Sequence, residues 1–142
     1  MKKKLFLLMA LFILFACETE ELKWVIKEYT VNSNQWELMN GANQLNSFYR
    51  AELKIPDLDR YVYENGNVFC YMYQTVDGVE VQTLLPFTIP YGERLGNGYE
   101  SLWTETISCD FTIGSVMIYV NYSDFNTSNK PPTASFRVVL NY

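Results

Sequence analysis

The sequence contains no histidine, and this absence excludes several kinds of enzyme site. A serine or cysteine nucleophile that depends on an imidazole base has no such base in this chain. Metal sites built on imidazole ligands are excluded for the same reason. Carboxylates are the main candidate catalytic groups that remain, and the chain has sixteen of them.

Basic residues are also scarce, with 11 Lys and Arg against 16 Asp and Glu. Three of them, Lys2, Lys3 and Lys4, precede an apolar run and are expected to be removed with it. The rest of the chain then holds eight basic and sixteen acidic residues, a formal charge of −8. A basic stripe that could neutralise phosphates is missing, so we expect no nucleic-acid partner and no attraction to anionic lipid headgroups.

The sequence has a single long hydrophobic run, residues 5–16, which is too short to cross a bilayer because a spanning helix takes about 20 residues. Lysines before the run and a small residue at its end are typical of a secretory signal. The tetrapeptide Leu14-Phe15-Ala16-Cys17 resembles the lipobox of bacterial lipoproteins. This resemblance implies that Cys17 is lipidated and becomes the mature N-terminus. The alternative is an ordinary secretory signal in which Cys17 occurs by chance.

Three acidic residues, Glu18, Glu20 and Glu21, follow the cysteine. An acidic run in this place resembles the surface-export signal of Bacteroidota lipoproteins, which implies an outer-membrane protein that faces the cell exterior. The alternative is a solvated linker, since charged residues near a terminus are commonly just exposed. The acyl chains on Cys17 would supply the membrane affinity, at about 0.8 kcal/mol for each buried CH₂.

We therefore expect three segments: a signal peptide at residues 1–16, an acidic tether with the lipidated cysteine at residues 17–23, and one folded domain at residues 24–142. Hydrophobic residues at 49% and aromatic residues at 16% argue for a packed domain rather than a disordered stalk. The length of the domain suffices for one core.

Short apolar patterns separated by turn signals run through this domain. Residues 48–55 alternate most clearly between apolar and charged side chains, which predicts a half-buried strand. Residues 57–66 predict a helix of about two turns with Asp57 as its N-cap. Pro86 and Pro90 are expected to interrupt strand pairing, and residues 91–98 to form a loop. The segments predicted as strands are residues 24–31, 36–39, 48–55, 68–73, 80–85, 99–111, 115–122 and 134–140.

This series of short strands predicts an all-β fold, an antiparallel β-sandwich of seven or eight strands with one short helix. A Greek-key barrel is the alternative architecture.

Cys70 and Cys109 stay in the chain after acylation of Cys17, and both lie on apolar strand patterns. A compartment beyond the inner membrane permits disulfides, so one reading is a bond between two strands. The other reading is two inert buried thiols. A catalytic thiol is disfavoured because no histidine could activate it.

Asp57, Asp59 and Glu64 have the oxygen ligands that calcium prefers, but the EF-hand spacing is missing. We interpret them as a capped, solvated helix start, and we expect neither a metal nor another cofactor. The sixteen acidic residues are enough to supply a pair of carboxylates for glycan hydrolysis. The candidate pairs are Glu100 with Glu105, or Glu80 with Glu93.

Several aromatic residues have the flat faces that could stack on sugar rings. Core and sheet packing is the more common role of such side chains and is the favoured interpretation. The residues are Trp36, Tyr61, Tyr63, Tyr71, Tyr73 and Trp103.

A series of weak structural motifs runs through the domain: Trp36, Ala51-Glu52-Leu53, residues 55–64, Gly66-Asn67-Val68-Phe69-Cys70-Tyr71, Leu85-Pro86 and Phe136-Arg137-Val138-Val139. With the signal and lipobox, this series resembles a set of small Bacteroidota lipoproteins of unknown function. The likeness covers most of residues 24–142 and implies a β-rich domain with no known catalytic residue.

The leading functional hypothesis is a lipid-anchored, surface-exposed binding or interaction module rather than an enzyme. Its partner would be a glycan, a host protein or another protein of the envelope. The alternatives are a carboxylate-based glycan hydrolase, and a structural subunit of an envelope assembly that uses an exposed edge strand.

Overall fold

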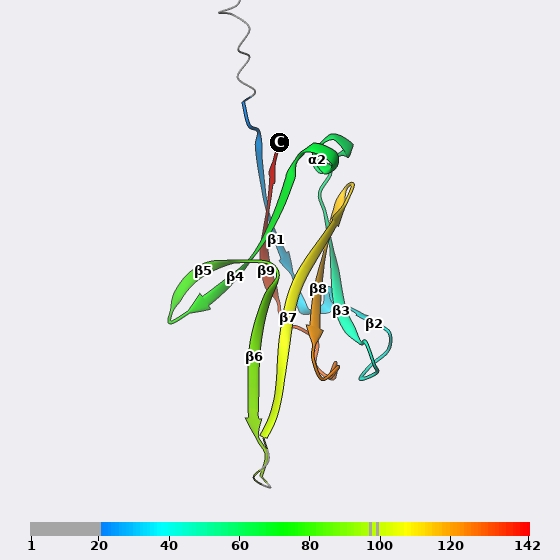
Figure 1. Cartoon of the computed structure of the whole chain (residues 1–142), viewed down its shortest axis with the longest axis vertical. Helices are drawn as coiled ribbons and strands as arrows, with labels where there is room; N and C mark the ends of the chain where they lie inside the picture. The colour runs from blue at the N-terminus through cyan, green and yellow to red at the C-terminus, as the bar shows by residue number, and fades with distance from the viewer. Residues whose placement is uncertain (1–20, 97, 99) are drawn as a thin grey trace, which may run out of the picture.

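The structure is a computed structural model that describes residues 21–96, 98 and 100–142. Two antiparallel sheets pack on one another, which confirms the predicted all-β sandwich with one short α-helix (Figure 1). The first sheet consists, in spatial order, of β1 (Trp24–Val31), β9 (Ala134–Asn141), β4 (Asn67–Val76) and β5 (Val79–Leu84). The second consists of β2 (Glu37–Met39), β3 (Phe48–Lys54), β8 (Ser115–Tyr122), β7 (Glu100–Thr112) and β6 (Phe87–Arg94). The helical segments are η1 (Ser33–Gln35) and α2 (Arg60–Asn65).

The core lies between the two sheets and follows from the alternation in the strands. Inward residues of β3 and β8 face inward residues of β9, and burying each such side chain contributes about 1.5–3 kcal/mol. Trp36 is the largest fully buried side chain, and it meets the ring of Phe136 edge-on with a centroid distance of 6.3 Å. The core residues of these three strands are Tyr49, Ala51, Leu53, Val116, Ile118, Val120, Phe136, Val138 and Leu140.

The helix α2 forms where the sequence predicts one, but Asp59 rather than Asp57 caps it. The carboxylate of Asp59 accepts a hydrogen bond from the Val62 backbone N–H at 2.9 Å. The helix ends at Gly66, whose N–H donates to the Val62 carbonyl oxygen, and an added Cβ there would lie only 2.8 Å from that oxygen. Asp57 is instead drawn to strand β1, where its carboxylate pairs with the Lys27 ammonium at 2.9 Å.

The structure corrects the prediction for the segment around Pro90. Residues 91–98 were expected to form a loop, but β6 runs from Phe87 to Arg94 and pairs along its whole length with β7. Proline cannot donate a backbone hydrogen bond, but a strand at the edge of a sheet needs donors on one side only. Since β6 pairs with β7 alone, Pro90 fits there without loss of a ladder bond.

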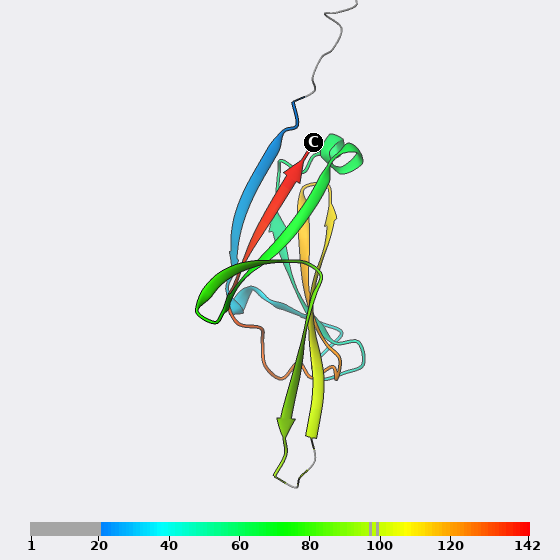
Figure 2. The same ribbon diagram turned by 60° about the vertical axis from the view of Figure 1, so that its left-hand side comes forward.

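The molecule has two distinct ends (Figures 1 and 2). At one end lie the first described residues, the C-terminus, α2 and the turn between β7 and β8. Backbone hydrogen bonds between Lys23 and Tyr142 join the two chain segments there, at 2.6 and 3.0 Å. At the other end, the β6–β7 hairpin extends beyond the remaining strands. In the described part of the chain, helices of sufficient length and hydropathy to cross a membrane are absent.

Candidate functional site

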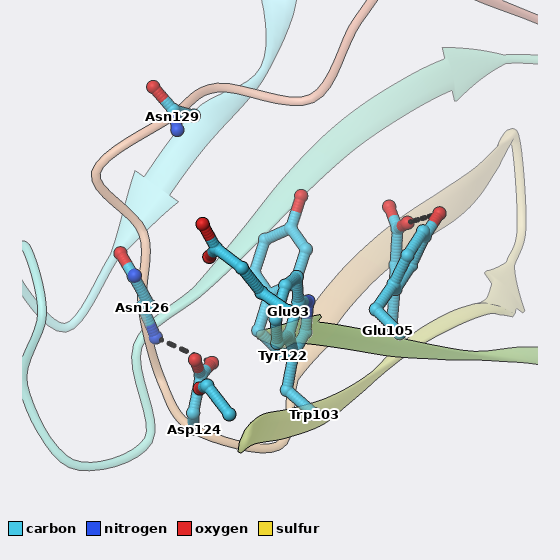
Figure 3. A pocket seen from close by; sticks show the side chains of 9 residues that line it. Glu93, Trp103, Glu105, Tyr122, Asp124, Asn126 and Asn129 are labelled. Carbon is cyan, nitrogen blue, oxygen red and sulfur yellow. Dashed lines mark hydrogen bonds between the residues drawn. The ribbon is translucent and has the colours of Figure 1, made fainter. Parts of the chain in front are cut away.

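A cleft of about 340 Å³ lies at the end formed by the β6–β7 hairpin (Figure 3). This volume is within the range of small-ligand sites, which measure about 300–1,000 Å³. Three strands of the second sheet and the loop between β8 and β9 line the cleft. Its residues are Tyr91, Glu93, Ser101, Trp103, Glu105, Tyr122, Asp124, Asn126 and Asn129.

The cleft exists because the inner face of the second sheet continues past the packed core. Ile107 on β7 is buried in the core, and Glu105, Trp103 and Ser101 follow it on the same face of the strand. On β6, Tyr91 lies opposite Trp103. Inward-facing positions that are filled by aliphatic residues in the core therefore present aromatic and polar groups here.

Two aromatic rings stack on one another in the wall of the cleft. Tyr91 and Trp103 have a centroid distance of 5.7 Å and an interplanar angle of 18°. The Tyr91 hydroxyl donates a hydrogen bond to the Glu105 carboxylate at 3.0 Å, which holds both groups in place. Tyr91 is nevertheless 39% exposed, so part of the aromatic surface is open to a ligand.

The loop after β8 supplies the amide side of the cleft and is fastened to the sandwich. Thr127 in this loop is buried, and its backbone N–H donates to the Asn43 side chain at 2.8 Å. The Tyr49 hydroxyl donates to the carbonyl of Thr127 at 2.7 Å. Nearby, the Asn126 backbone N–H donates to the Asp124 carboxylate at 3.1 Å. The polar groups therefore stand on an ordered support, as specific binding requires.

Negative charge dominates the electrostatics of the cleft. Glu93, Glu105 and Asp124 all line it, and the lining contains neither Lys nor Arg. Burial and the neighbouring Glu105 carboxylate raise the pKa of Tyr122 above its ordinary value. Burial and the hydrogen bond to Glu105 also raise the pKa of Tyr91. Both phenols therefore stay neutral hydrogen-bonding groups across the physiological pH range.

A smaller apolar cavity of about 230 Å³ adjoins the cleft and shares three of its residues: Tyr91, Glu105 and Tyr122. Its walls are formed by core residues of both sheets, among them Trp36, Met72 and Phe136. The cleft thus has a polar mouth with an apolar floor between the sheets.

The aromatic residues singled out from the sequence are spread over the molecule. Trp36 is buried in the core, and Tyr61 and Tyr63 lie on α2 at the opposite end. Tyr71 and Tyr73 are on β4, where the Tyr73 hydroxyl donates to Glu28 at 2.8 Å. Of the six, Trp103 alone lines the cleft, and its partners there are two residues that the sequence analysis did not single out, Tyr91 and Tyr122.

The two carboxylate pairs considered as candidates from the sequence do not share a cavity. Glu105 lines the main cleft, whereas Glu100 lies beyond it and pairs with the Arg94 guanidinium at 3.5 Å. Glu93 also lines the main cleft, whereas Glu80 lies on β5 in a separate surface hollow. The cleft instead combines Glu93 with Glu105, a combination visible only once β6 is recognised as a strand.

The three carboxylates considered as calcium ligands each have a structural role at α2. Asp59 caps the helix, and Glu64 pairs with Arg60 at 3.2 Å. The contact with Lys27 holds the pKa of Asp57 below its ordinary value. Within residues 21–96, 98 and 100–142, clusters of three or more His, Cys, Asp or Glu side chains suited to a metal ion are absent.

Cys70 and Cys109 come from different sheets, and both side chains pack in the core between the sheets. Cys70 is on β4 and Cys109 on β7, and both thiols are free in the structure. The neighbouring Cys109 thiol and burial together raise the pKa of the Cys70 thiol well above its ordinary value. The two candidates from the sequence are thus brought together.

Of the residues predicted for export and anchoring, Cys17, Glu18 and Glu20 lie outside the described residues. Glu21 is the first described residue, and it lines a shallow surface hollow beside Leu22, Lys23, Tyr61 and Tyr142.

Comparison of the chain with protein-family models, with curated proteins and with solved structures found no match.

Proposed function

We propose that this chain is a lipid-anchored, surface-exposed lipoprotein of the outer membrane that binds a glycan in the cleft between β6, β7 and the β8–β9 loop. The observation that carries the binding proposal is the stacked pair Tyr91–Trp103 beside three carboxylates and two asparagines. Support for the anchor comes from the sequence, in the order of basic residues, apolar run, Cys17 and acidic run.

The chemistry of the cleft favours a neutral sugar as ligand. An aromatic face offers apolar area to the C–H face of a sugar ring. Carboxylates accept hydrogen bonds from hydroxyl groups, and asparagine amides both donate and accept them. Phosphate or sulfate groups would be repelled by Glu93, Glu105 and Asp124. A neutral glycan can form hydrogen bonds with all of these groups and adds no further negative charge to the cleft.

Replacing Trp103 tests the binding proposal. Binding of the full chain in detergent to a neutral-glycan array selects a ligand, and titration calorimetry then measures its affinity. For Trp103→Ala we expect a loss of about 2 kcal/mol, roughly 30-fold in Kd, because a central aromatic contact is removed. Trp24→Ala is the matched control and should leave the Kd unchanged, since Trp24 is the first residue of β1, pairs with Asn141 and does not line the cleft. Equal affinity of wild type and Trp103→Ala would contradict the assignment of the cleft.

A second candidate function is hydrolysis of the bound glycan, because Glu93 and Glu105 line one cleft. Glycosidases use such pairs of carboxylates as acid and base or nucleophile. Release of reducing sugar from the selected glycan, lost in Glu105→Gln while binding persists, would favour hydrolysis. Binding of the glycan without release of reducing sugar would favour a binding module over a hydrolase.

The anchor has its own test in Cys17→Ser. We expect wild type to incorporate radiolabelled palmitate and to sediment with the outer membrane, because acyl chains hold it there. The variant should lose the label and leave the membrane fraction. A Cys17→Ser chain that is still labelled and membrane-bound would contradict the lipoprotein proposal.

A further inference from the structure

Exposed aromatic side chains gather at the end of the sandwich opposite the cleft. Among the described residues, six aromatic side chains are exposed, and Tyr91 is the one that belongs to the cleft. The other five belong to elements that meet where the N-terminal segment enters the fold (Figures 1 and 2). They are Trp24 on β1, Tyr61 and Tyr63 on α2, Phe69 on β4 and Phe111 on β7.

Three chain segments, residues 22–24, 61–63 and 111–113, combine four of these side chains with neighbouring aliphatic ones at this end of the fold. We call this set the anchor-end surface and define it as Leu22, Trp24, Tyr61, Tyr63, Phe111 and Ile113, each of which is at least 42% exposed. Apolar groups clustered in this way on a monomer commonly mark an interaction site.

The fold holds this surface in a fixed shape. The ring of Tyr63 on α2 meets Phe111 of β7 edge-on at 5.8 Å. Tyr61 meets the C-terminal Tyr142 in the same way at 6.2 Å, and the Lys23 ammonium lies 5.0 Å from the centroid of the Tyr142 ring. Backbone bonds between Gly114 and the segment before α2, at 2.7 and 2.8 Å, join the β7–β8 turn to the helix. The aromatic groups are therefore displayed by a rigid end and not by a loose loop.

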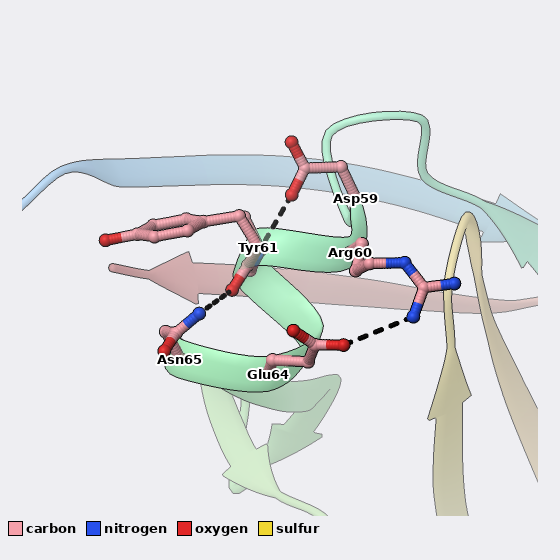
Figure 4. Close-up of polar contacts among 6 residues, drawn as sticks. Asp59, Arg60, Tyr61, Glu64 and Asn65 are labelled. Atoms are coloured by element: carbon pink, nitrogen blue, oxygen red, sulfur yellow. Dashed lines mark hydrogen bonds and ion pairs between the residues drawn. The ribbon is translucent and has the colours of Figure 1, made fainter.

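Most of the acidic groups near this surface are engaged within the protein. Arg60 pairs with Glu64 at 3.2 Å along α2, and the Asp59 carboxylate accepts the capping hydrogen bond (Figure 4). Asp57 pairs with Lys27. The chain as a whole is acidic, but these carboxylates are paired locally with cations or backbone donors. They therefore oppose contact with an apolar or zwitterionic partner less than free carboxylates would.

The short stretch of chain between Cys17 and the anchor-end surface indicates that the partner of this surface is the membrane. Cys17 precedes Glu21 by four residues, and a fully extended chain spans at most about 3.6 Å per residue, so roughly 14 Å separates them at most. The headgroup region on each face of a bilayer is roughly 5–8 Å thick. The acyl chains of Cys17 would thus hold the anchor-end surface within reach of the lipid headgroups.

We propose that the anchor-end surface docks on the membrane that holds Cys17, with its aromatic rings in the headgroup layer. This inference rests on the proposed acylation of Cys17. Trp and Tyr favour the membrane–water interface because their rings are apolar and their edges form hydrogen bonds. The docked sandwich stands upright, and its cleft then faces away from the bilayer, toward ligands in solution.

The three tryptophans provide the test, because they occupy different places. Trp24 is on the anchor-end surface, Trp36 is in the core and Trp103 is in the distal cleft. The acylated full chain is reconstituted into phosphatidylcholine vesicles whose acyl chains carry bromine near the headgroups, which quenches tryptophan emission on contact. We expect wild type to lose the share of emission that comes from Trp24, and Trp24→Phe to show no loss.

Matched charge substitutions on β7 separate docking from mere proximity to the anchor. Phe111→Glu should abolish the quenching of Trp24 while the chain still floats with the vesicles. Leu102→Glu is the control, since Leu102 is 73% exposed on the same strand at the other end and should leave the quenching unchanged. Thermal unfolding of both variants checks that the fold is retained.

Each contrary result has a defined meaning. A chain that is acylated and vesicle-bound, with unquenched Trp24, overturns docking and leaves the anchor intact. A chain that is neither acylated nor vesicle-bound overturns the anchor and the docking together. A blue-shifted but unquenched Trp24 would show that a second copy of the chain covers the surface, which also overturns docking on lipid.

Discussion

At the scale of single residues, the tryptophans show how the place of a side chain in the fold decides its role. Trp36 is 2% exposed, its ring packs on Phe136, and its indole N–H donates to the Pro132 carbonyl at 3.1 Å. Trp24 has the same side chain on an edge strand and is 59% exposed. The two form a natural pair for measuring what burial contributes.

Trp36→Ala should destabilise the fold by about 3–5 kcal/mol, because it removes a large buried ring and leaves the Pro132 carbonyl without its donor. Urea unfolding followed by circular dichroism measures the change. Trp24→Ala should shift the free energy of unfolding by no more than about 0.5 kcal/mol. Similar losses in the two variants would show that Trp36 does not anchor the core.

At the scale of elements, strand β6 decides whether the site can be recognised. Eight of the nine strands and the helix follow from local patterns, because alternation and turn residues report which face of a segment is buried. Strand β6 was not predicted because it contains Pro90, and proline is tolerated in a strand only where that strand lacks a neighbour on one side. Edge position is a property of the sheet and not of the segment. Without β6, Tyr91 and Glu93 had no predictable partners, and the cleft was not foreseen.

The contact between Cys70 and Cys109 leads to a prediction about the two sheets. If the chain occupies the envelope as proposed, we expect it to carry a Cys70–Cys109 disulfide when isolated from there, because neighbouring thiols oxidise in such a compartment. Mass spectrometry of alkylated, denatured protein should find neither thiol free. Closing a loop of about 40 residues should stabilise the oxidised form by roughly 4 kcal/mol over the reduced form.

The variant with both cysteines replaced by alanine is the control for this prediction. Its unfolding should not respond to reductant, whereas that of wild type should. Quantitative alkylation of both thiols in protein taken directly from the envelope would instead support the interpretation as two inert buried thiols.

At the scale of the whole molecule, the long axis separates the two ends and their proposed tasks. The N-terminal segment enters at one end, and the β6–β7 hairpin, whose strands line the cleft, forms the other end (Figure 1). This arrangement suits a module that is held by lipid and that binds away from the membrane. It also places Arg94, whose side chain is 81% exposed, on the far hairpin.

Trypsin added to intact cells should cleave after Arg94 if the acidic residues behind Cys17 direct the protein outward. Immunoblotting detects the fragment, and Arg94→Gln should abolish it. Replacing Glu18, Glu20 and Glu21 by alanine should protect the chain until the cells are opened. Protection of wild type in intact cells would show that the domain faces the periplasm.

The sequence by itself determined the fold class, most of the strands and the prediction of an anchored domain, because these depend on neighbouring residues and on composition. Tertiary structure alone decided the cleft and the meeting of Cys70 with Cys109. In the cleft, strand register and the packing of the two sheets bring together residues from β6, β7, β8 and the β8–β9 loop. Such contacts join residues far apart in the chain, and no local pattern encodes them.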